Sequence, residues 1–463
     1  MPQKGWNRLT AQRTHILLIA SDSIDAQMAG PGIRYWEFAR QLSRQHEVTL
    51  ITPNRTSLSH PAFRLVHRTR SSLKNALQLA DVIVTQGMMM PLAPILLCKK
   101  PLVVDLYDPL PIEVLEHHSH LPVHEAQLSQ SHCIDRVKVL LECGDFFLYS
   151  HERQRDYWLG LLTSIGRINH RTYREDPSYS TLLACVPFGI SNDAPQHTRS
   201  VLKGENLLFR PEDTVILWGG GLWKWFDPCS LIRAMQRITA ERNDIKLLFL
   251  GARRAASDSS GIQIAYATDA AVAFSKELGL YQRSVFFHED WIPYAERHNY
   301  FLESDIGLST HFETLETHFS FRTRILDYLW AELPIITTQG DVLSERVRQH
   351  QLGITVAPGQ IMELQQAILR LADDREFHAQ CRENIRRFRR QFSWSQCLRP
   401  LENFCASPYR SCHKNRLIVL SALCRLQLKT VKHLVRYRGY KKLWKKIAQK
   451  LNEISHSHAT GKP

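Results

Sequence analysis

Two features in the second half of the chain have the chemistry to bind a phosphate group. Three consecutive glycines, Gly219–Gly221, follow an apolar run and precede a helical pattern, so their backbone amides could approach an anion closely. Arg322 and Arg324 lie in a short loop before a helix that is predicted to start near Ile325. An anion there would meet guanidinium groups and the positive end of the helix dipole. A plain tight turn and surface salt bridges are the competing interpretations.

Carboxylates in the first half supply a second kind of chemistry. Asp105 and Asp108 stand at the carboxyl end of an apolar run, and Glu113 lies beyond them. A carboxylate at such a position can bind hydroxyl groups of a ligand or act as a general base. We single out Asp108 for this role, with a merely solvated loop carboxylate as the alternative.

The order of apolar runs predicts two domains that hold these residues. Continuous apolar strands separated by helical patterns are typical of parallel sheets buried on both faces. The first series comprises 15–21, 47–53, 80–87, 101–108 and 145–150. The second series comprises 214–221, 245–251, 284–289, 305–310 and 333–338. The predicted fold class is therefore α/β, with two doubly wound parallel sheets.

A cleft between the two domains is the expected ligand site. Residues 185–200 combine Pro, Gly, Asn and Asp and predict the interdomain linker. The carboxyl ends of both sheets would then face each other across the cleft. The loop Gly30-Pro31-Gly32, which precedes a helix predicted over 33–45, would also face it, either as a phosphate or sugar contact or simply as a helix entry turn.

Composition places the chain among globular proteins. It has 463 residues, 44% hydrophobic and 22% charged, and a net charge of +14. Residues 410–463 hold 14 of the 59 Lys and Arg residues and only one acidic residue, so the rest is nearly neutral. Ten scattered cysteines without a CxxC pair indicate reduced thiols, and no run approaches the ~18 apolar residues of a membrane span. The apolar run that follows His15 is too short for a signal peptide core, so we expect a cytoplasmic protein.

Taken in order, four segments resemble the group 1 glycosyltransferases (glycosyltransferase family 4) over roughly residues 14–405. Residues 30–54 resemble the glycine loop and first helix of these enzymes, and 185–191 (CVPFGIS) resemble their interdomain signature. Residues 215–228 (VILWGGGLWKWFDP) stand where the family has its diphosphate loop, and 303–341 resemble its donor-binding stretch. The resemblance implies a GT-B fold and transfer of a sugar from a nucleotide-diphosphate sugar, with retention of configuration.

The resemblance also implies roles for particular side chains. Asp327 occupies the place of the family's second acidic residue, which binds the ribose diol, although a helix-stabilising aspartate is the alternative. Eight residues earlier Phe319 replaces the family's first Glu, so Glu313 and Glu316 are the candidates for the sugar hydroxyls. Gly221 stands in the position of a family arginine. We therefore expect the cationic role to have moved to Arg322, Arg324 and Lys224; loss of catalysis, leaving a GT-B scaffold, is the alternative.

The predicted site residues are these. The catalytic candidates are Asp108 and Arg322. The candidates for donor binding are Gly30, Gly32, Gly220, Gly221, Lys224, Arg322, Thr323, Arg324 and Asp327. Cations and N–H donors that hold the leaving diphosphate make a metal dispensable, so no metal and no cofactor are expected. A dinucleotide-dependent enzyme is disfavoured because no GxGxxG follows the first strand.

The basic tail predicts a membrane contact. Between 416 and 451 the pattern indicates two amphipathic helices split at Gly439. The apolar stripes are Leu420, Cys424, Leu428, Val431 and Val435 in the first helix, and Tyr440, Leu443, Trp444, Ile447 and Leu451 in the second. A Trp among lysines suits an anionic membrane surface. A packed terminal helix is the main alternative, and nucleic-acid binding is disfavoured because no such module is recognisable.

The predicted organisation has four parts: an acceptor domain over 14–187, a donor domain over 195–380, helices that return to the first domain over 381–409, and the tail over 410–463. Partners would be a nucleotide sugar and a glycan or lipid-linked acceptor of the cell envelope, with the protein peripheral on the inner face of the membrane. The nucleotide, sugar, acceptor and oligomeric state stay open.

Overall fold

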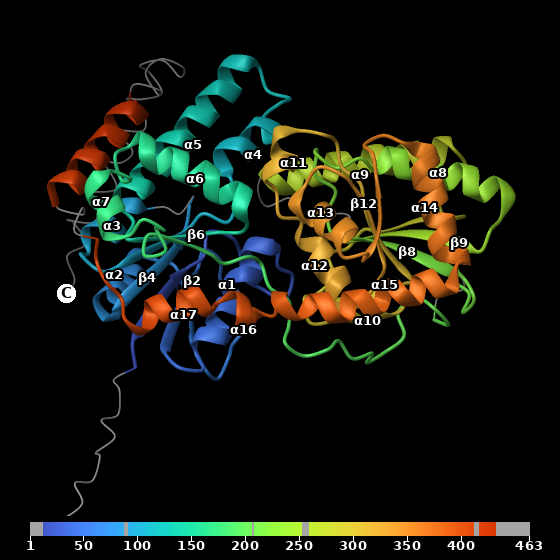
Figure 1. Ribbon diagram of the computed structural model, residues 1–463, viewed down its shortest axis with the longest axis horizontal. Helices are drawn as coiled ribbons and strands as arrows, with labels where there is room; N and C mark the ends of the chain where they lie inside the picture. The colour runs from blue at the N-terminus through green and yellow to red at the C-terminus, as the bar shows by residue number, and fades with distance from the viewer. Residues whose placement is uncertain (1–12, 88–90, 206–207, 252–258, 412–415, 432–463) are drawn as a thin grey trace, which may run out of the picture.

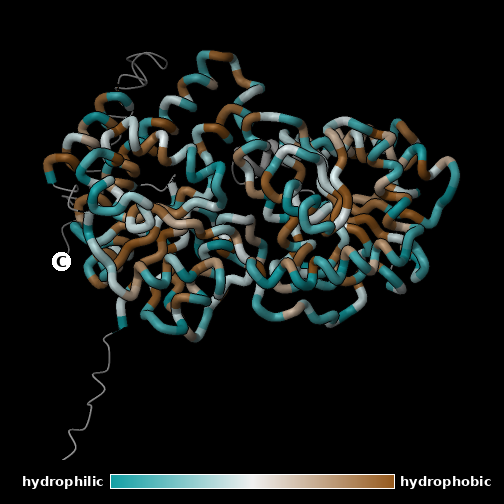
Figure 2. The backbone as a smooth tube through the Cα atoms, in the orientation of Figure 1, coloured by the Kyte–Doolittle hydropathy of each residue, from teal (hydrophilic) through white to brown (hydrophobic). Residues whose placement is uncertain are grey.

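Two α/β domains lie side by side in the computed structural model, which describes residues 13–87, 91–205, 208–251, 259–411 and 416–431 (Figure 1). Each domain is built on one parallel β-sheet. The strands are the most hydrophobic segments and lie inside each domain, whereas the helices around them alternate in hydropathy (Figure 2). The predicted pair of doubly wound parallel sheets is confirmed.

The first domain has a seven-stranded sheet with the order β3-β2-β1-β4-β5-β6-β7. Its strands are β1 (His15–Ile19), β2 (Glu47–Thr52), β3 (Arg64–His67), β4 (Val82–Gln86), β5 (Leu102–Asp105), β6 (Phe146–Tyr149) and β7 (Leu183–Cys185). Its helices are α1 (Gly30–Leu42), α2 (Arg70–Leu79), α3 (Leu92–Leu97), α4 (Leu110–His117), α5 (Val123–Cys143), α6 (Glu152–Ser164) and α7 (His170–Glu175). Strand order reverses at β1, which lies between β2 and β4, so a ligand crevice is expected at its carboxyl end.

The second domain repeats this plan with six strands in the order β10-β9-β8-β11-β12-β13. Its strands are β8 (Thr214–Gly219), β9 (Ile245–Leu250), β10 (Val285–His288), β11 (Ile306–Ser309), β12 (Ile335–Thr338) and β13 (Gly353–Val356). Its helices are α8 (Pro228–Glu241), α9 (Ser259–Glu277), α10 (Arg297–Leu302), α11 (Leu315–Phe319), α12 (Thr323–Trp330), α13 (Val342–Gln349) and α14 (Ile361–Asp373). The reversal here is at β8, whose carboxyl end carries the three glycines.

The sequence pattern missed three of the four edge strands. All ten predicted strands are present, but β3, β7 and β13 were not predicted, and each lies at a sheet edge. An edge strand has a neighbour on one side only and is often short, so it need not form the continuous apolar run of a central strand. Two helix starts also differ: α1 begins at Gly30 and α12 at Thr323, earlier than predicted. Pro31 in the first turn of α1 suits a helix start, because proline lacks an N–H that would be unpaired there.

The chain returns from the second domain to the first through α15 (Arg375–Phe388), a 3₁₀ turn η1 (Arg389–Phe392), α16 (Trp394–Cys397) and α17 (Arg399–Ala406). The returning segment meets the outgoing linker, since the Ile190 N–H donates to the Phe392 carbonyl at 2.8 Å and the Trp394 N–H donates to the Ile190 carbonyl at 3.0 Å. α17 then packs on the first sheet, where the rings of Phe146 and Phe404 stack 4.7 Å apart. The chain thus passes from the second domain back to the first through this segment.

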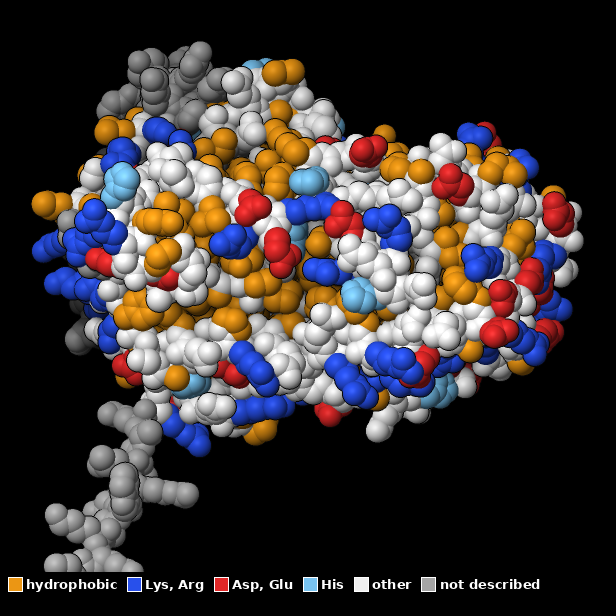
Figure 3. Space-filling model, in the orientation of Figure 1, with side chains coloured by type: hydrophobic (Ala, Val, Ile, Leu, Met, Phe, Trp, Pro, Cys, Tyr) orange, Lys and Arg blue, Asp and Glu red, His pale blue; other side chains and the backbone are white. Residues whose placement is uncertain are grey.

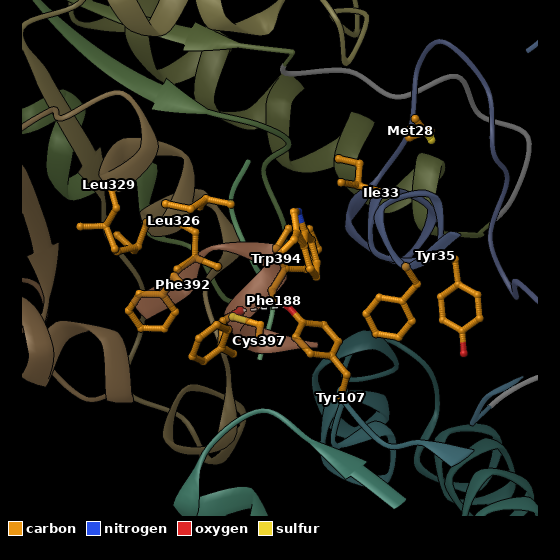
Figure 4. Packing of buried hydrophobic residues seen from close by; sticks show 14 of the residues in the cluster. Met28, Ile33, Tyr35, Tyr107, Phe188, Leu326, Leu329, Phe392, Trp394 and Cys397 are labelled. Carbon is orange, nitrogen blue, oxygen red and sulfur yellow. Dashed lines mark hydrogen bonds between the residues drawn. The ribbon is translucent and has the colours of Figure 1, made fainter. Parts of the chain in front are cut away.

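One hydrophobic core runs through both domains at this crossing. Figure 4 shows Trp394 and Phe188 between residues of α12, such as Leu326, and residues of the first domain, such as Tyr107. The Phe188 and Trp394 rings are 5.0 Å apart, and both side chains are buried. Apolar burial at this crossing therefore holds the two domains together on one side of the cleft.

The tail begins with a helix over 416–431 that packs on the first domain. Its inner face comprises Val419, Ala422, Leu423 and Leu426, which join the core of the first domain. Arg425 pairs with Glu142, and Lys429 pairs with Asp135, both on α5. The helix therefore packs on the domain through this face, and not through the apolar stripe that was predicted to contact a membrane.

The predicted stripe instead faces outward. Leu420, Cys424, Leu428 and Val431 are all exposed, and so is Leu417 beside them. Val435 and the predicted second helix lie outside the described residues. Within the part of the chain that the structure describes, no helix is long and apolar enough to cross a bilayer.

Candidate active site

A cavity of about 530 Å³ opens between the carboxyl ends of the two sheets. Of the predicted site residues, nine line it: Gly30, Asp108, Gly220, Gly221, Glu316, Arg322, Thr323, Arg324 and Asp327. The two domains approach closely there, since a Cβ on Gly30 of the first domain would lie 4.0 Å from Thr323 Oγ1 of the second. Residues predicted from distant segments thus share one cleft.

The three glycines form an open loop at the end of β8. The Gly219 N–H donates to the Tyr328 hydroxyl at 2.8 Å, which fixes the start of the loop on α12. Gly220 has φ +97°, a left-handed conformation that favours glycine, and no atom lies within 4 Å of where its Cβ would be. The backbone at Gly220 is therefore accessible to a ligand in the cleft.

Arg324 lies against this loop. Its Nη2 donates to the Gly221 carbonyl oxygen at 2.8 Å, and its guanidinium lies 4.0 Å from the centre of the Phe226 ring. Its Nη1 is buried and has no hydrogen-bond partner among the residues that the structure describes. Burial lowers the pKa of Arg324 to about 10, so the group is still cationic at neutral pH. A buried cation with an unsatisfied N–H beside an open glycine loop is suited to bind an anion.

Arg322 is neutralised by a carboxylate. Its two terminal nitrogens donate to the Glu316 carboxylate at 3.0 and 2.6 Å. Behind this pair, Oδ2 of Asp341 lies 3.9 Å from Arg322 Nε, and burial raises the pKa of Asp341 to about 6. Burial also lowers the pKa of His311 to about 3, so this neighbour is neutral. Arg322 therefore forms the wall of the cleft together with Glu316, and its charge is less available to an anion than that of Arg324.

Asp327 lies on α12, one turn beyond Arg324. Arg297 Nη1 is 2.8 Å from its Oδ1 and 2.9 Å from its Oδ2. The Arg297 guanidinium lies 4.3 Å from the centre of the Tyr294 ring, which holds it in place. Burial raises the pKa of Asp327, and Arg297 opposes this shift. The carboxylate is thus fixed at the cavity wall with lone pairs left for further donors.

These features occur in a segment that matches a known family. Residues 213–374 match the family model for glycosyl transferases group 1. The second domain is a group 1 glycosyl transferase domain. No curated protein matches the sequence of the chain.

Solved structures with the same two-domain architecture show that the chain has a GT-B fold. Sucrose-phosphate synthase from Thermosynechococcus elongatus matches with a TM-score of 0.56 and 16% identity, over 84% of this chain and 97% of that one. WaaG, a glycosyltransferase involved in lipopolysaccharide biosynthesis, matches with a TM-score of 0.58 and 13% identity, over 85% of this chain and 100% of that one. HepE from Anabaena, solved with UDP and glucose, matches with a TM-score of 0.59 and 12% identity, over 85% of this chain and 100% of that one. At these identities the likeness establishes the fold.

In the first domain, Asp108 and Asp105 have different surroundings. Asp105 is buried and forms an ion pair with Arg34, with N–O distances of 2.8 and 3.0 Å. It does not line the cleft, which does not support a role for it as a ligand-binding carboxylate or a base. Asp108 lines the cleft, and burial together with the nearby Asp105 and Glu316 charges raises its pKa to about 7. Burial and Asp108 raise the pKa of Glu113 well above its usual range, against the opposing charge of Arg322. Asp108 can therefore exchange a proton near neutral pH.

Three predicted residues lie outside the cavity lining. A Cβ on Gly32 would be 2.4 Å from the Ser23 carbonyl oxygen, so this glycine allows close packing at the start of α1. Glu313 is exposed on the loop before α11. Lys224 lies at the edge of the cleft, where burial lowers its pKa and Glu116 raises it. None of the three contributes to the cavity wall in the described part of the chain.

Sequence reasoning missed an aromatic group on the cleft wall. The Trp223 and Trp225 rings stack 5.2 Å apart, and His117 of α4 lies edge-on to them at 5.4 and 5.1 Å. Trp225 Nε1 is buried without a hydrogen-bond partner. The sequence feature that could have indicated this aromatic wall is the pair of Trp residues on either side of Lys224, just after the glycine loop. Arg297 was also missed, because it precedes Asp327 by 30 residues.

Proposed function

We propose that the protein transfers a glycosyl group, of hexosyl type, from a nucleoside diphosphate sugar to a hydroxyl group of a glycan or lipid-linked acceptor. The observation that carries this proposal is the buried Arg324 guanidinium, which has an unsatisfied N–H beside the open Gly219–Gly221 loop. The group 1 match over 213–374 supports the same reaction class. HepE, of similar fold, was solved with UDP and glucose, which is the kind of ligand proposed here.

The donor would bind mainly to the second domain. The diphosphate meets Arg324 and the backbone at Gly220, and the Asp327 carboxylate accepts hydrogen bonds from the ribose hydroxyls. As the bond from the anomeric carbon to the phosphate oxygen breaks, its electron pair passes to the diphosphate. Arg324 binds the diphosphate more strongly as this charge develops, which lowers the barrier. Because protein cations and N–H groups meet this charge, the proposed reaction does not need a metal ion or a cofactor.

The acceptor would bind from the first domain. Its hydroxyl oxygen forms the new bond to the anomeric carbon, and its proton passes to Asp108. With a pKa of about 7, Asp108 is a base matched to neutral pH. The Glu316 and Arg322 pair would bind the sugar hydroxyls. The acceptor oxygen would attack from the face that the diphosphate leaves, so that the anomeric configuration is retained.

The experiment that tests this function is a screen of the purified full chain against UDP-, GDP-, dTDP- and ADP-sugars. Thermal shift and calorimetry report binding, and release of the nucleoside diphosphate reports transfer. Saturable binding to one nucleotide class is the expected result. Absence of binding to every donor would contradict the proposal and favour a GT-B scaffold without activity.

The proposed place of action is the surface of an anionic membrane, on its inner face. The helix over 416–431 exposes Leu417 to 77%, Leu420 to 38% and Leu428 to 71%, although it is packed on the domain by its other side. Lys and Arg side chains gather at this end of the first domain (left in Figure 3). The 32 residues that follow contain nine Lys and Arg and one acidic residue. An exposed apolar stripe next to basic chain suits an anionic bilayer surface.

A further inference from the structure

The two walls of the cleft carry charges of opposite sign. On the second domain the cationic lining residues are Arg297, Arg322 and Arg324. On the first domain the charged lining residues are Asp22, Asp108 and Glu113, and no Lys or Arg of the described chain lines that wall. The acceptor wall is therefore acidic.

Two of the three arginines already have carboxylate partners. Arg297 is paired with Asp327, and Arg322 is paired with Glu316. The remaining cation, Arg324, lies against the glycine loop, where the proposed function puts the diphosphate of the donor. The positive charge of the cleft is thus concentrated at the donor site and is not available to an acceptor.

Arg34 of the first domain, whose charge acts on Asp108, cannot serve an acceptor either. Arg34 is fully buried. Its Nε and Nη2 donate to Asp105, and it also donates to the backbone carbonyls of Val186 and Pro187 at 2.8 and 3.0 Å. With its donors used inside the domain, Arg34 supplies no N–H to the cleft.

Neither Asp108 nor Glu113 forms an ion pair with a residue of the described chain, and apolar side chains, among them Leu110 and Phe188, lie beside them on the wall. Their raised pKa values agree with a site where negative charge is poorly compensated. A phosphate or carboxylate group placed there would meet carboxyl groups and apolar surface. Arg322, whose charge opposes the rise of the Glu113 pKa, is already paired with Glu316.

We propose that the acceptor wall admits an uncharged polyhydroxy compound, such as a sugar residue or polyol, whose cleft-bound part carries no phosphate or carboxylate. This inference rests on the proposed function for the assignment of the two walls. Hydroxyl groups suit the wall because they donate to carboxylates and accept from protonated carboxyl groups, whereas anions need Lys, Arg or several N–H groups.

The test compares glucose with glucose 6-phosphate, two probes that share the same sugar ring and differ by one phosphate group. The full chain is first saturated with the nucleoside diphosphate that binds best, so that Arg324 is occupied, and each probe is then titrated while tryptophan fluorescence is followed. If no nucleotide binds, which would count against the proposed function, Arg324→Ala protein is used to remove the donor anion site. In either case the titration compares the affinity of the acceptor wall for the uncharged and the phosphorylated probe.

Two variants on α4 provide the matched comparison. Glu113→Lys puts a cation on the acceptor wall, whereas Glu116→Lys makes the same change one turn away, outside the cavity lining. We expect glucose 6-phosphate to bind at least tenfold more tightly to Glu113→Lys than to the parent protein, with less than a threefold change in Glu116→Lys. Tighter binding of glucose 6-phosphate than of glucose to the parent, or no gain in Glu113→Lys, overturns the proposal.

Discussion

His151 Nε2 lies 3.0 Å from the carbonyl oxygen of Phe319, so a histidine of the first domain is bonded to the second domain. The same carbonyl accepts a hydrogen bond from Gln154 at 2.9 Å. Phe319 is the residue at which the resemblance to group 1 enzymes predicts an acidic side chain. In this chain the position instead joins the two domains, and its ring packs against Tyr157.

The His151 contact leads to a prediction about acid stability. Burial lowers the pKa of His151 to about 4, from a usual value near 6.5. Unfolded chains therefore take up this proton at a higher pH than folded ones, and the folded state loses stability as the pH falls from about 6.5 to 4. The His151→Gln variant keeps an N–H donor but cannot take up this proton. We therefore expect its free energy of unfolding to fall by roughly 2 kcal/mol less than that of the parent when the pH is lowered. Urea unfolding of both proteins at pH 7 and pH 4.5 measures it; an unchanged pH dependence would show that His151 does not titrate in this way.

Asp108 leads to a prediction about the pH dependence of transfer. A base must be deprotonated to take the acceptor proton, so activity should rise as the pH increases through about 7. Asp108→Asn should lower the rate by on the order of 100-fold or more and abolish this rise. The rate of nucleotide release between pH 5.5 and 8.5 is the measurement. A variant that keeps the same pH profile would assign the rise to another group.

Asp327 should bind the ribose of the donor nucleotide and not its phosphates. We expect Asp327→Ala to lower the affinity for a nucleoside diphosphate by about tenfold, because hydrogen bonds to a charged group contribute roughly 1.5–3 kcal/mol. Inorganic pyrophosphate, which lacks the ribose, should bind equally to both proteins. The comparison is made by calorimetry; an equal loss for both ligands would point to general damage from the unpaired Arg297.

The exposed stripe of the tail helix should contribute to membrane binding. Replacing Leu417, Leu420 and Leu428 by Ser should reduce partition into vesicles with anionic lipid by at least tenfold, since each buried side chain contributes roughly 1.5 kcal/mol or more. Met362→Ser on α14, also exposed, is the control. Vesicle flotation at low salt measures this. Equal flotation of the triple variant and the parent would mean that this stripe is not the contact.

The central strands of both sheets could be predicted because they are continuous apolar runs, but side-chain partners could not. Asp105 and Asp108 look alike in sequence, yet only the fold brings Asp105 to Arg34. Arg322 and Arg324 likewise look equivalent, and the path of the loop through α11 decides that Glu316 pairs with Arg322. In the tail, the sequence offers two apolar faces, and only the fold shows that Val419 and Ala422 belong to the packed one.

Affinity for a nucleotide sugar in Arg324 variants tests the central claim most directly. The donor that the screen identifies is titrated calorimetrically into the parent protein, Arg324→Gln and the exposed control Arg387→Gln. We predict that Arg324→Gln loses at least tenfold in affinity, about 1.4 kcal/mol, and that the control binds as the parent does. Unchanged affinity in Arg324→Gln would contradict the assignment of the diphosphate to the glycine loop and its buried arginine.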